Sequence, residues 1–314
     1  MRKILINDGI HPKGEALLKE AGFEVDTTKI PQDELKEKLP AYAAICVRSA
    51  TKVRQELIEA CPDLKVIGRG GVGLDNIDVD FARSKGIQVI NTPAASSRSV
   101  GELAFAHMLS LSRFVHDSNR QMPASGASEF KNLKKKYSKG IEMEGKVLGV
   151  IGLGRIGQET VKLGLGMGME VVGVDPFVSD VDVSLKVGGH TVKVNISSIP
   201  MEDMLAKADY ISLHVPFTGA PILGTKEFDQ MKDGVVVVNC ARGGTIDEDA
   251  LLAALESGKV RACGLDVFDN EPTPRKDLLS HPRISLTPHI GASTGEAQAK
   301  IGIELAEKVI AALK

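Results

Sequence analysis

Short apolar runs alternate with amphipathic stretches along most of the 314 residues. Such runs have the length of buried strands, and the stretches between them have the periodicity of helices. Strands that alternate with helices predict parallel βαβ units with right-handed crossovers, so we expect an α/β fold of two Rossmann-like or flavodoxin-like lobes. The strand-like runs lie near residues 3–7, 23–28, 43–48, 64–68 and 87–91, and again near 147–152, 170–174, 209–215, 234–240, 260–266 and 284–287.

Four segments add to this alternation. Ser99–Glu102 matches the S-x-x-E capping box and predicts the start of a long helix. Residues 123–140 are polar and rich in lysine, and we interpret them as an exposed connection between the lobes. Residues 181–194 alternate apolar and polar positions around a Gly-Gly pair, which predicts an inserted β-hairpin. Ser293–Glu296 is a second capping box, and the final helix that it opens can return to pack on the first lobe.

Composition narrows the class of protein. Lysine and arginine total 39 against 41 acidic residues, and there is no tryptophan, which argues against a nucleic-acid partner. No apolar run approaches the length of a membrane span, so we expect a cytoplasmic protein without a membrane partner. The scattered cysteines form no C-x-x-C pair, which indicates reduced thiols rather than disulfides or a metal site. They are Cys46, Cys61, Cys240 and Cys263.

A glycine-rich turn between a strand and a helix carries the first chemical signal. The run 152–157 reads Gly-Leu-Gly-Arg-Ile-Gly, the G-x-G-x-x-G fingerprint of dinucleotide binding. Gly152 permits the tight turn, Gly154 lets the backbone approach a pyrophosphate, and Gly157 lets helix and strand pack closely. Asp175 ends the next strand, 18 residues after Gly157, where a carboxylate can bind ribose hydroxyls and repel a 2′-phosphate. The expected cofactor is therefore NAD rather than NADP.

Three polar residues follow neighbouring strand-like runs in the last third of the chain. They are Arg242, Glu271 and His289, and open α/β sheets bind ligands at such strand ends. Arg242 can clamp the carboxylate of a keto acid, and His289 can exchange a proton with its carbonyl oxygen. Glu271 can hold His289 and favour the imidazolium. His214 also ends a strand, and we interpret it as a wall of the cofactor site rather than an acid.

With these motifs in place, nearly the whole chain resembles the D-isomer-specific 2-hydroxyacid dehydrogenases. The first half shares the runs 47–53, 68–76 and 91–93 with that family, and the second half shares 152–157, 239–244, 266–272 and 289–294. The resemblance implies a substrate-binding domain of residues 1–95 plus 291–314 around an NAD-binding domain of residues 96–290.

The resemblance also assigns roles to residues. It implies that Arg242, Glu271 and His289 are catalytic, and that Arg48, Arg69 and the backbone near Gly71 bind substrate together with Arg242 and His289. The implied NAD contacts, joined to those of the fingerprint, are Arg155, Ile156, Asp175, Cys240, Ala241, Asp266, Gly291 and Ala292.

Within the family the resemblance is closest to the members that oxidise D-3-phosphoglycerate to 3-phosphohydroxypyruvate in serine biosynthesis. The alternative is a glyoxylate or hydroxypyruvate reductase, and a third hypothesis is an NAD-sensing corepressor. A homodimer through the long helix is also expected by resemblance. Two features depart from the pattern: residues 127–137 lack the family's usual tryptophan, and the sequence ends at Lys314, so we do not expect regulatory C-terminal domains. The lysines of residues 131–139 form either a solvated face or a phosphate-attracting rim.

Overall fold

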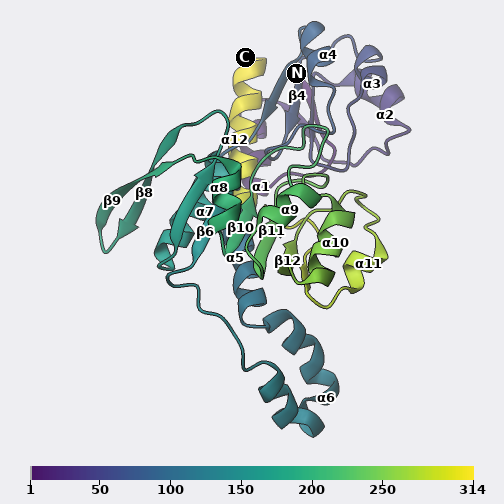
Figure 1. The fold of residues 1–314 in the computed structure, drawn as a ribbon. Helices are drawn as coiled ribbons and strands as arrows, with labels where there is room; N and C mark the ends of the chain where they lie inside the picture. Colours follow the sequence, from purple (N-terminus) through teal and green to yellow (C-terminus); the bar gives the residue numbers. More distant parts are fainter. Residues whose placement is uncertain (1) are drawn as a thin grey trace. The chain divides into compact units, whose positions relative to one another are not determined.

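The computed structural model describes residues 2–314, which divide into two compact units. The first comprises the chain up to Ser97 together with Ala292–Lys314, and the second comprises Arg98–Gly291 (Figure 1). Each unit is built on its own parallel sheet, which confirms the predicted α/β class. Within residues 2–314, no helix combines the length and the apolar character needed to cross a membrane.

The described part of the first unit forms a five-stranded sheet in the order β2-β1-β3-β4-β5, with all neighbours parallel. This is the flavodoxin-like order, which reverses between β1 and β3. The strands are β1 (Lys3–Ile6), β2 (Glu24–Asp26), β3 (Ala44–Val47), β4 (Val66–Arg69) and β5 (Gln88–Asn91). The helices are α1 (Pro12–Glu20), α2 (Leu35–Lys38), the short 3-10 helix η1 (Leu39–Ala41), α3 (Gln55–Glu59), α4 (Val79–Ser84) and α12 (Gly295–Leu313).

The C-terminal helix α12 completes the first unit. Leu305 and Val309 are buried with residues of β1, β3 and β4. A Cβ on Gly14 of α1 would lie 2.3 Å from the carbonyl oxygen of Gly302, so two glycines let α1 and α12 approach closely. The N-cap is Thr294, whose Oγ1 accepts a hydrogen bond from Ala297 N. The predicted capping box, which began at Ser293, was therefore one residue out of register.

The described part of the second unit forms a six-stranded parallel sheet in the order β13-β12-β11-β10-β6-β7. The order reverses between β6 and β10, so the carboxyl ends of these strands mark the expected ligand site. The strands are β6 (Val147–Ile151), β7 (Glu170–Val174), β10 (Tyr210–Leu213), β11 (Val235–Asn239), β12 (Val260–Leu265) and β13 (Ile284–Leu286). The helices that alternate with them are α7 (Arg155–Gly166), α8 (Met201–Lys207), α9 (Thr225–Gln230), α10 (Glu248–Ser257) and α11 (Lys276–Ser280).

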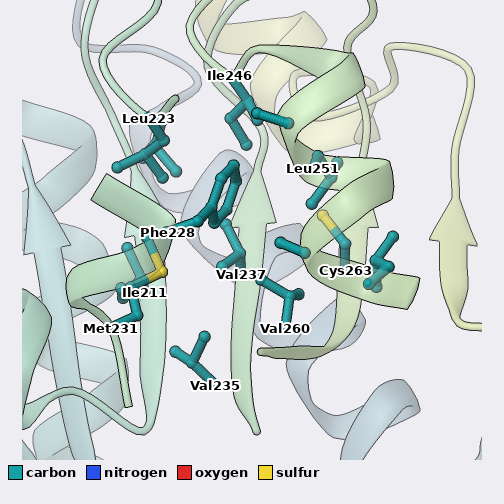
Figure 2. Close-up of a cluster of buried hydrophobic side chains, with 14 of the residues drawn as sticks. Ile211, Leu223, Phe228, Met231, Val235, Val237, Ile246, Leu251, Val260 and Cys263 are labelled. Atoms are coloured by element: carbon teal, nitrogen blue, oxygen red, sulfur yellow. The ribbon is translucent and has the colours of Figure 1, made fainter. Parts of the chain in front are cut away.

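Apolar packing fixes the strands that lead to this site. Figure 2 shows Val237 of β11 and Ile211 of β10 beneath Phe228 of α9, with Leu251 of α10 beside them. All four side chains are at most 2% exposed. Burying a side chain of this size contributes about 1.5–3 kcal/mol. The loops at the carboxyl edge of the sheet therefore start from a rigid base.

The predicted hairpin is present, whereas the long helix begins earlier than predicted. The inserted hairpin is confirmed as β8 (Asp180–Val187) and β9 (His190–Ser197), joined at Gly188 and Gly189, which both have positive φ. The long helix α5 (Ser97–Ser112) begins two residues before the predicted capping box, so Ser99 lies inside it.

The polar segment 123–140 was wrongly interpreted as a connection between the lobes. Most of it lies in α6 (Val115–Lys136), which belongs to the second unit and extends away from its sheet (Figure 1). The helix is broken at Glu129, and Lys136 Nζ comes within 2.9 Å of Asp117 Oδ2. The lysines near its end are good helix formers, whereas the polarity and the closely spaced lysines suggested an exposed connection.

Candidate active site

The glycine turn has the geometry of a dinucleotide site. Gly152 follows β6 with φ +95°, and a Cβ there would lie 2.7 Å from the carbonyl oxygen of His214, which follows β10. A Cβ on Gly157 would lie 1.9 Å from the carbonyl oxygen of Gly152, so only glycine lets α7 start so close to the turn. Gly154 has no atom within 4 Å of the position of its Cβ. This open space at the helix N-terminus fits a pyrophosphate.

Alanine substitutions at Gly154 and Gly157 should have different effects, the first on NADH binding and the second on stability. Gly154→Ala should leave the melting temperature within about 2 °C of wild type, because the new methyl group meets no protein atom. It should nevertheless weaken NADH binding about 10-fold or more, because the methyl group occupies the space through which the pyrophosphate approaches the backbone. Gly157→Ala should instead destabilise the fold, because its methyl group has no room. Thermal melts and NADH titrations of both variants make the comparison; unchanged NADH affinity in Gly154→Ala would argue against this site.

The side chain of Asp175 is hydrogen-bonded to the same turn. Its Oδ2 accepts a hydrogen bond from Leu153 N at 2.8 Å, and its Oδ1 accepts one from Phe177 N at 2.9 Å. Each oxygen retains a further lone pair for a ligand hydroxyl. The carboxylate is thus fixed beside the glycine turn, as an adenosine ribose would require.

Cys240 is buried and His214 is partly buried beside this region, and neither is a reactive group. Burial lowers the pKa of His214 to about 3, so its ring is neutral at physiological pH. Its Nε2 lies 2.9 Å from Ser212 Oγ, while its buried Nδ1 finds no hydrogen-bond partner in the described part of the chain. Burial also raises the pKa of the Cys240 thiol well above its usual value. Both residues suit a lining role, and neither suits acid or nucleophile chemistry.

His289 and Glu271 form a hydrogen-bonded pair. His289 Nδ1 lies 2.7 Å from Glu271 Oε2, and Glu271 Oε1 accepts a bond from Phe268 N at 3.1 Å. Burial raises the pKa of Glu271, but the hydrogen bond with His289 and its charge outweigh burial, so the pKa lies below its ordinary value. The stability that Glu271 contributes is therefore present above pH 4.5 and is lost as the pH falls through its depressed pKa.

The loop that carries His289 is strained and tightly held. His289 has φ +54°, a left-handed conformation that costs a residue other than glycine about 1–2 kcal/mol. Asp266, 1% exposed, accepts hydrogen bonds from Ile290 N and Gly291 N, while its carbonyl oxygen accepts one from His289 N. The role that this geometry supports for Asp266 is to hold the loop. The His289–Glu271 pair also lines a cavity of about 430 Å³ inside the second unit.

Arg242 lies in a turn that its neighbours brace. The Arg242 carbonyl oxygen accepts hydrogen bonds from Asn239 Nδ2 at 2.9 Å and Thr245 Oγ1 at 2.7 Å. A Cβ on Gly243 would lie 2.0 Å from the carbonyl oxygen of Phe268, so glycine lets this turn lie against the segment that carries Glu271. The charge of Arg242 contributes to the lowered pKa of Glu271. The structure thus brings the cation, the acid and the imidazole to one edge of the second sheet.

The candidate substrate residues of the first unit also share a sheet edge. Arg48 follows β3 directly, and Val47 pairs with Arg69 at the end of the adjacent strand β4. Arg48 N donates to Asp8 Oδ2 at 2.8 Å. A Cβ on Gly71 would lie 1.7 Å from Arg69 Nη1, so the missing side chain makes room for the guanidinium.

Several supporting residues were missed in the sequence. Asp8 and Asn76 bind the backbone around Arg48, Asn239 and Thr245 brace Arg242, and Thr287 donates to Asp266. All are polar residues in the strand ends or in the segments that follow them, which was the available signal. It is a weak one, because such positions also favour ordinary turn residues.

Comparison with known proteins places this geometry in a family. Residues 105–291 match the model of the NAD-binding domain of the D-isomer-specific 2-hydroxyacid dehydrogenases. A hydroxypyruvate reductase of Thermotoga maritima is 42% identical over 313 residues, which cover 98% of this chain and 97% of that protein. A D-3-phosphoglycerate dehydrogenase of Methanocaldococcus jannaschii is also 42% identical, over 98% of this chain but only 57% of its own length.

Solved structures show the same fold. A glyoxylate reductase from Paecilomyes thermophila matches 100% of this chain and 95% of its own, with a TM-score of 0.83 and 30% identity. The holo form of the D-mandelate dehydrogenase of Rhodotorula graminis matches 98% of this chain and 93% of its own, with a TM-score of 0.84 and 25% identity.

Proposed function

Because the chain belongs to the D-isomer-specific 2-hydroxyacid dehydrogenases, which carry an NAD-binding domain, we propose that it interconverts D-3-phosphoglycerate and 3-phosphohydroxypyruvate. The observation that supports this proposal is that Arg48 and Arg69 lie at the carboxyl ends of the neighbouring strands β3 and β4 of the first unit. Two guanidinium groups exceed what one substrate carboxylate requires, and arginine binds phosphate through bidentate hydrogen bonds. A substrate with both a carboxylate and a phosphate provides anionic groups for both arginines to bind.

The second unit supplies the groups for the chemical step. When NAD is bound, its nicotinamide accepts the hydride from C2 of the hydroxy acid. His289 takes the hydroxyl proton as that hydride leaves, and it returns the proton when the keto acid is reduced. Glu271 holds the ring through Nδ1, which leaves Nε2 for the substrate oxygen. Arg242 binds the carboxylate and polarises the carbonyl group.

The substrate assignment predicts a large effect of the phosphate group. With NADH as reductant, kcat/KM for 3-phosphohydroxypyruvate should exceed that for hydroxypyruvate by about 10- to 150-fold, because hydrogen bonds to charged groups contribute about 1.5–3 kcal/mol. Initial-rate kinetics on the two keto acids, each with NADH and NADPH, measure this ratio and the cofactor preference. If removing the phosphate left kcat/KM unchanged, the phosphoglycerate assignment would be wrong.

A matched pair of variants tests whether the preference for the phosphorylated keto acid depends on Arg48. Arg48→Gln should reduce the preference for the phosphorylated keto acid. Arg83→Gln removes an equal charge from the last turn of α4, whose end lies at the opposite edge of the same sheet, and should leave the preference unchanged. Equal effects of the two substitutions would indicate a general electrostatic contribution rather than a binding site.

The runner-up is a hydroxypyruvate reductase. The observation in its favour is that the Thermotoga relative with this activity matches this chain almost end to end. Faster turnover of hydroxypyruvate than of its phosphate ester would support it. The third hypothesis, an NAD-sensing corepressor, requires NADH binding without turnover of any 2-keto acid.

We also propose that the chain forms a homodimer, and that α6 makes the contact in place of the long helix α5 expected from the resemblance. Val115, Met122 and Phe130 on this helix are 54%, 44% and 58% exposed, an unusual apolar surface for a helix in water. Light scattering during gel filtration should give twice the 33.5 kDa chain mass. Phe130→Glu should shift the protein toward monomer, whereas Val187→Glu on the hairpin should not; a monomeric wild type would exclude the proposal.

A further inference from the structure

A buried chain of hydrogen bonds connects α5 to the loop that carries His289. His107 of α5 is 3% exposed, and its Nδ1 lies 2.9 Å from Ser285 Oγ. Its Nε2 lies 3.0 Å from Thr287 Oγ1, and Thr287 Oγ1 donates to Asp266 Oδ1 at 2.6 Å. Asp266 in turn accepts the amides of Ile290 and Gly291. The chain thus runs without a gap from the core to the two residues that follow His289.

The protons in this chain have one consistent arrangement. Burial lowers the pKa of His107, so its ring is neutral and has one donor and one acceptor nitrogen. The single hydroxyl proton of Thr287 is committed to Asp266, so Nε2 of His107 must donate to Thr287. Nδ1 then accepts from Ser285. Every bond points toward the Asp266 carboxylate.

The fold makes specific room for this imidazole. A Cβ on Gly264 of β12 would lie 2.7 Å from the Cβ of His107 and 2.9 Å from its Cγ. The ring therefore packs directly against the strand that leads to Asp266. An apolar side chain would fill this space but would leave Ser285 and Thr287 without a partner nitrogen.

We propose that His107 is a positioning residue for proton transfer by His289, an inference that rests on the acid–base role of His289 in the proposed function. His107 holds the Thr287 hydroxyl, and Thr287 orients the Asp266 carboxylate. Asp266 then holds the amide of the strained His289 through its carbonyl oxygen and the next two amides through its carboxylate. A left-handed residue persists only where its surroundings hold it. If these contacts loosen, His289 relaxes and leaves the geometry required to meet the substrate oxygen.

Two amide substitutions of His107 test whether its hydrogen bond to Thr287 matters or whether any buried polar side chain at this position suffices. In His107→Gln the side-chain amide can reach the place of Nε2 and donate to Thr287. In His107→Asn the shorter amide can reach only the Nδ1 side, toward Ser285. The glutamine variant should keep kcat within about 3-fold of wild type. The asparagine variant should lose about 10- to 100-fold in kcat with little change in KM, as expected when a reacting group is misplaced. Ser112→Ala removes a buried hydroxyl from the same helix, where it bonds to Tyr210, and should change neither quantity.

Amide hydrogen exchange of the peptide covering residues 286–292 provides a readout independent of substrate identity. Exchange at Ile290 and Gly291 should be faster in His107→Asn than in His107→Gln, Ser112→Ala or wild type. Unchanged exchange in the asparagine variant, or equal losses of kcat in both amide variants, would overturn the proposal. Failure of the wild type to reduce any 2-keto acid would overturn the proposed function instead, and the exchange comparison would still decide whether His107 holds the loop.

Discussion

Replacing His289 by alanine is expected to lower kcat for keto-acid reduction by about 10²–10⁴-fold, the usual contribution of a positioned proton donor. The variant loses the imidazole that pairs with Glu271 at 2.7 Å, while the backbone bonds from this loop to Asp266 remain available. The cofactor turn at Gly152–Gly157 is untouched. Turnover should therefore fall while NADH affinity stays within about 3-fold of wild type.

Stopped-time assays with saturating NADH and keto acid measure the loss, and a fluorescence titration measures NADH binding. His281→Ala provides a matched control, because His281 also pairs with a glutamate, Glu256, but lies just before β13, at the opposite edge of the sheet. Normal activity of His289→Ala would refute the acid–base role. A simultaneous collapse of NADH binding would show damage to the site rather than loss of an acid.

Replacing Arg242 by lysine should lower kcat/KM by about 10- to 150-fold even though the charge is kept, because hydrogen bonds to a charged group contribute about 1.5–3 kcal/mol and lysine cannot reproduce the guanidinium fork. The turn itself should survive, since Asn239 and Thr245 bind the backbone carbonyl of residue 242 and not its side chain. The loss should appear in both kcat and KM, because the arginine binds the carboxylate and polarises the carbonyl group.

Initial-rate kinetics of Arg242→Lys are best compared with Arg283→Lys. Arg283 precedes β13, so it lies at the amino edge of the same sheet, away from the loops that carry the site. The control should retain kcat/KM within about 2-fold, as is usual for surface substitutions. Wild-type kinetics in Arg242→Lys would mean that this side chain supplies charge alone.

Much of the architecture follows from local sequence. Each predicted strand is present, and the buried central strands follow from continuous apolar runs such as the four valines of β11. The hairpin at Gly188 and Gly189 was equally predictable, since both turn residues need positive φ. The pairing of His289 with Glu271 was also predicted, because the carboxyl ends of parallel strands meet at one edge of the sheet.

Helix α6 shows where local reasoning fails. Its polar residues and Pro123 are typical of a loop, and nothing in the sequence shows that the segment after Glu129 turns back until Lys136 meets Asp117. The capping residues were likewise misplaced by one or two positions. Adjacent serines and threonines each fit the cap pattern, so the local sequence places a helix start only to within one or two residues.

The sequence by itself determined the α/β class, the dinucleotide turn at Gly152–Gly157 and the strand-following segments that carry Arg242, Glu271 and His289, because strand periodicity and glycine geometry are local properties. Only the tertiary structure decided the strand order, the fold of α6 and the part played by His107. His107 lies 178 residues from Ser285, and such a contact depends on how α5 packs against β12 and β13. A histidine in an apolar helix carries no local mark of its partners, so its connection to the His289 loop emerges only when the chain is folded.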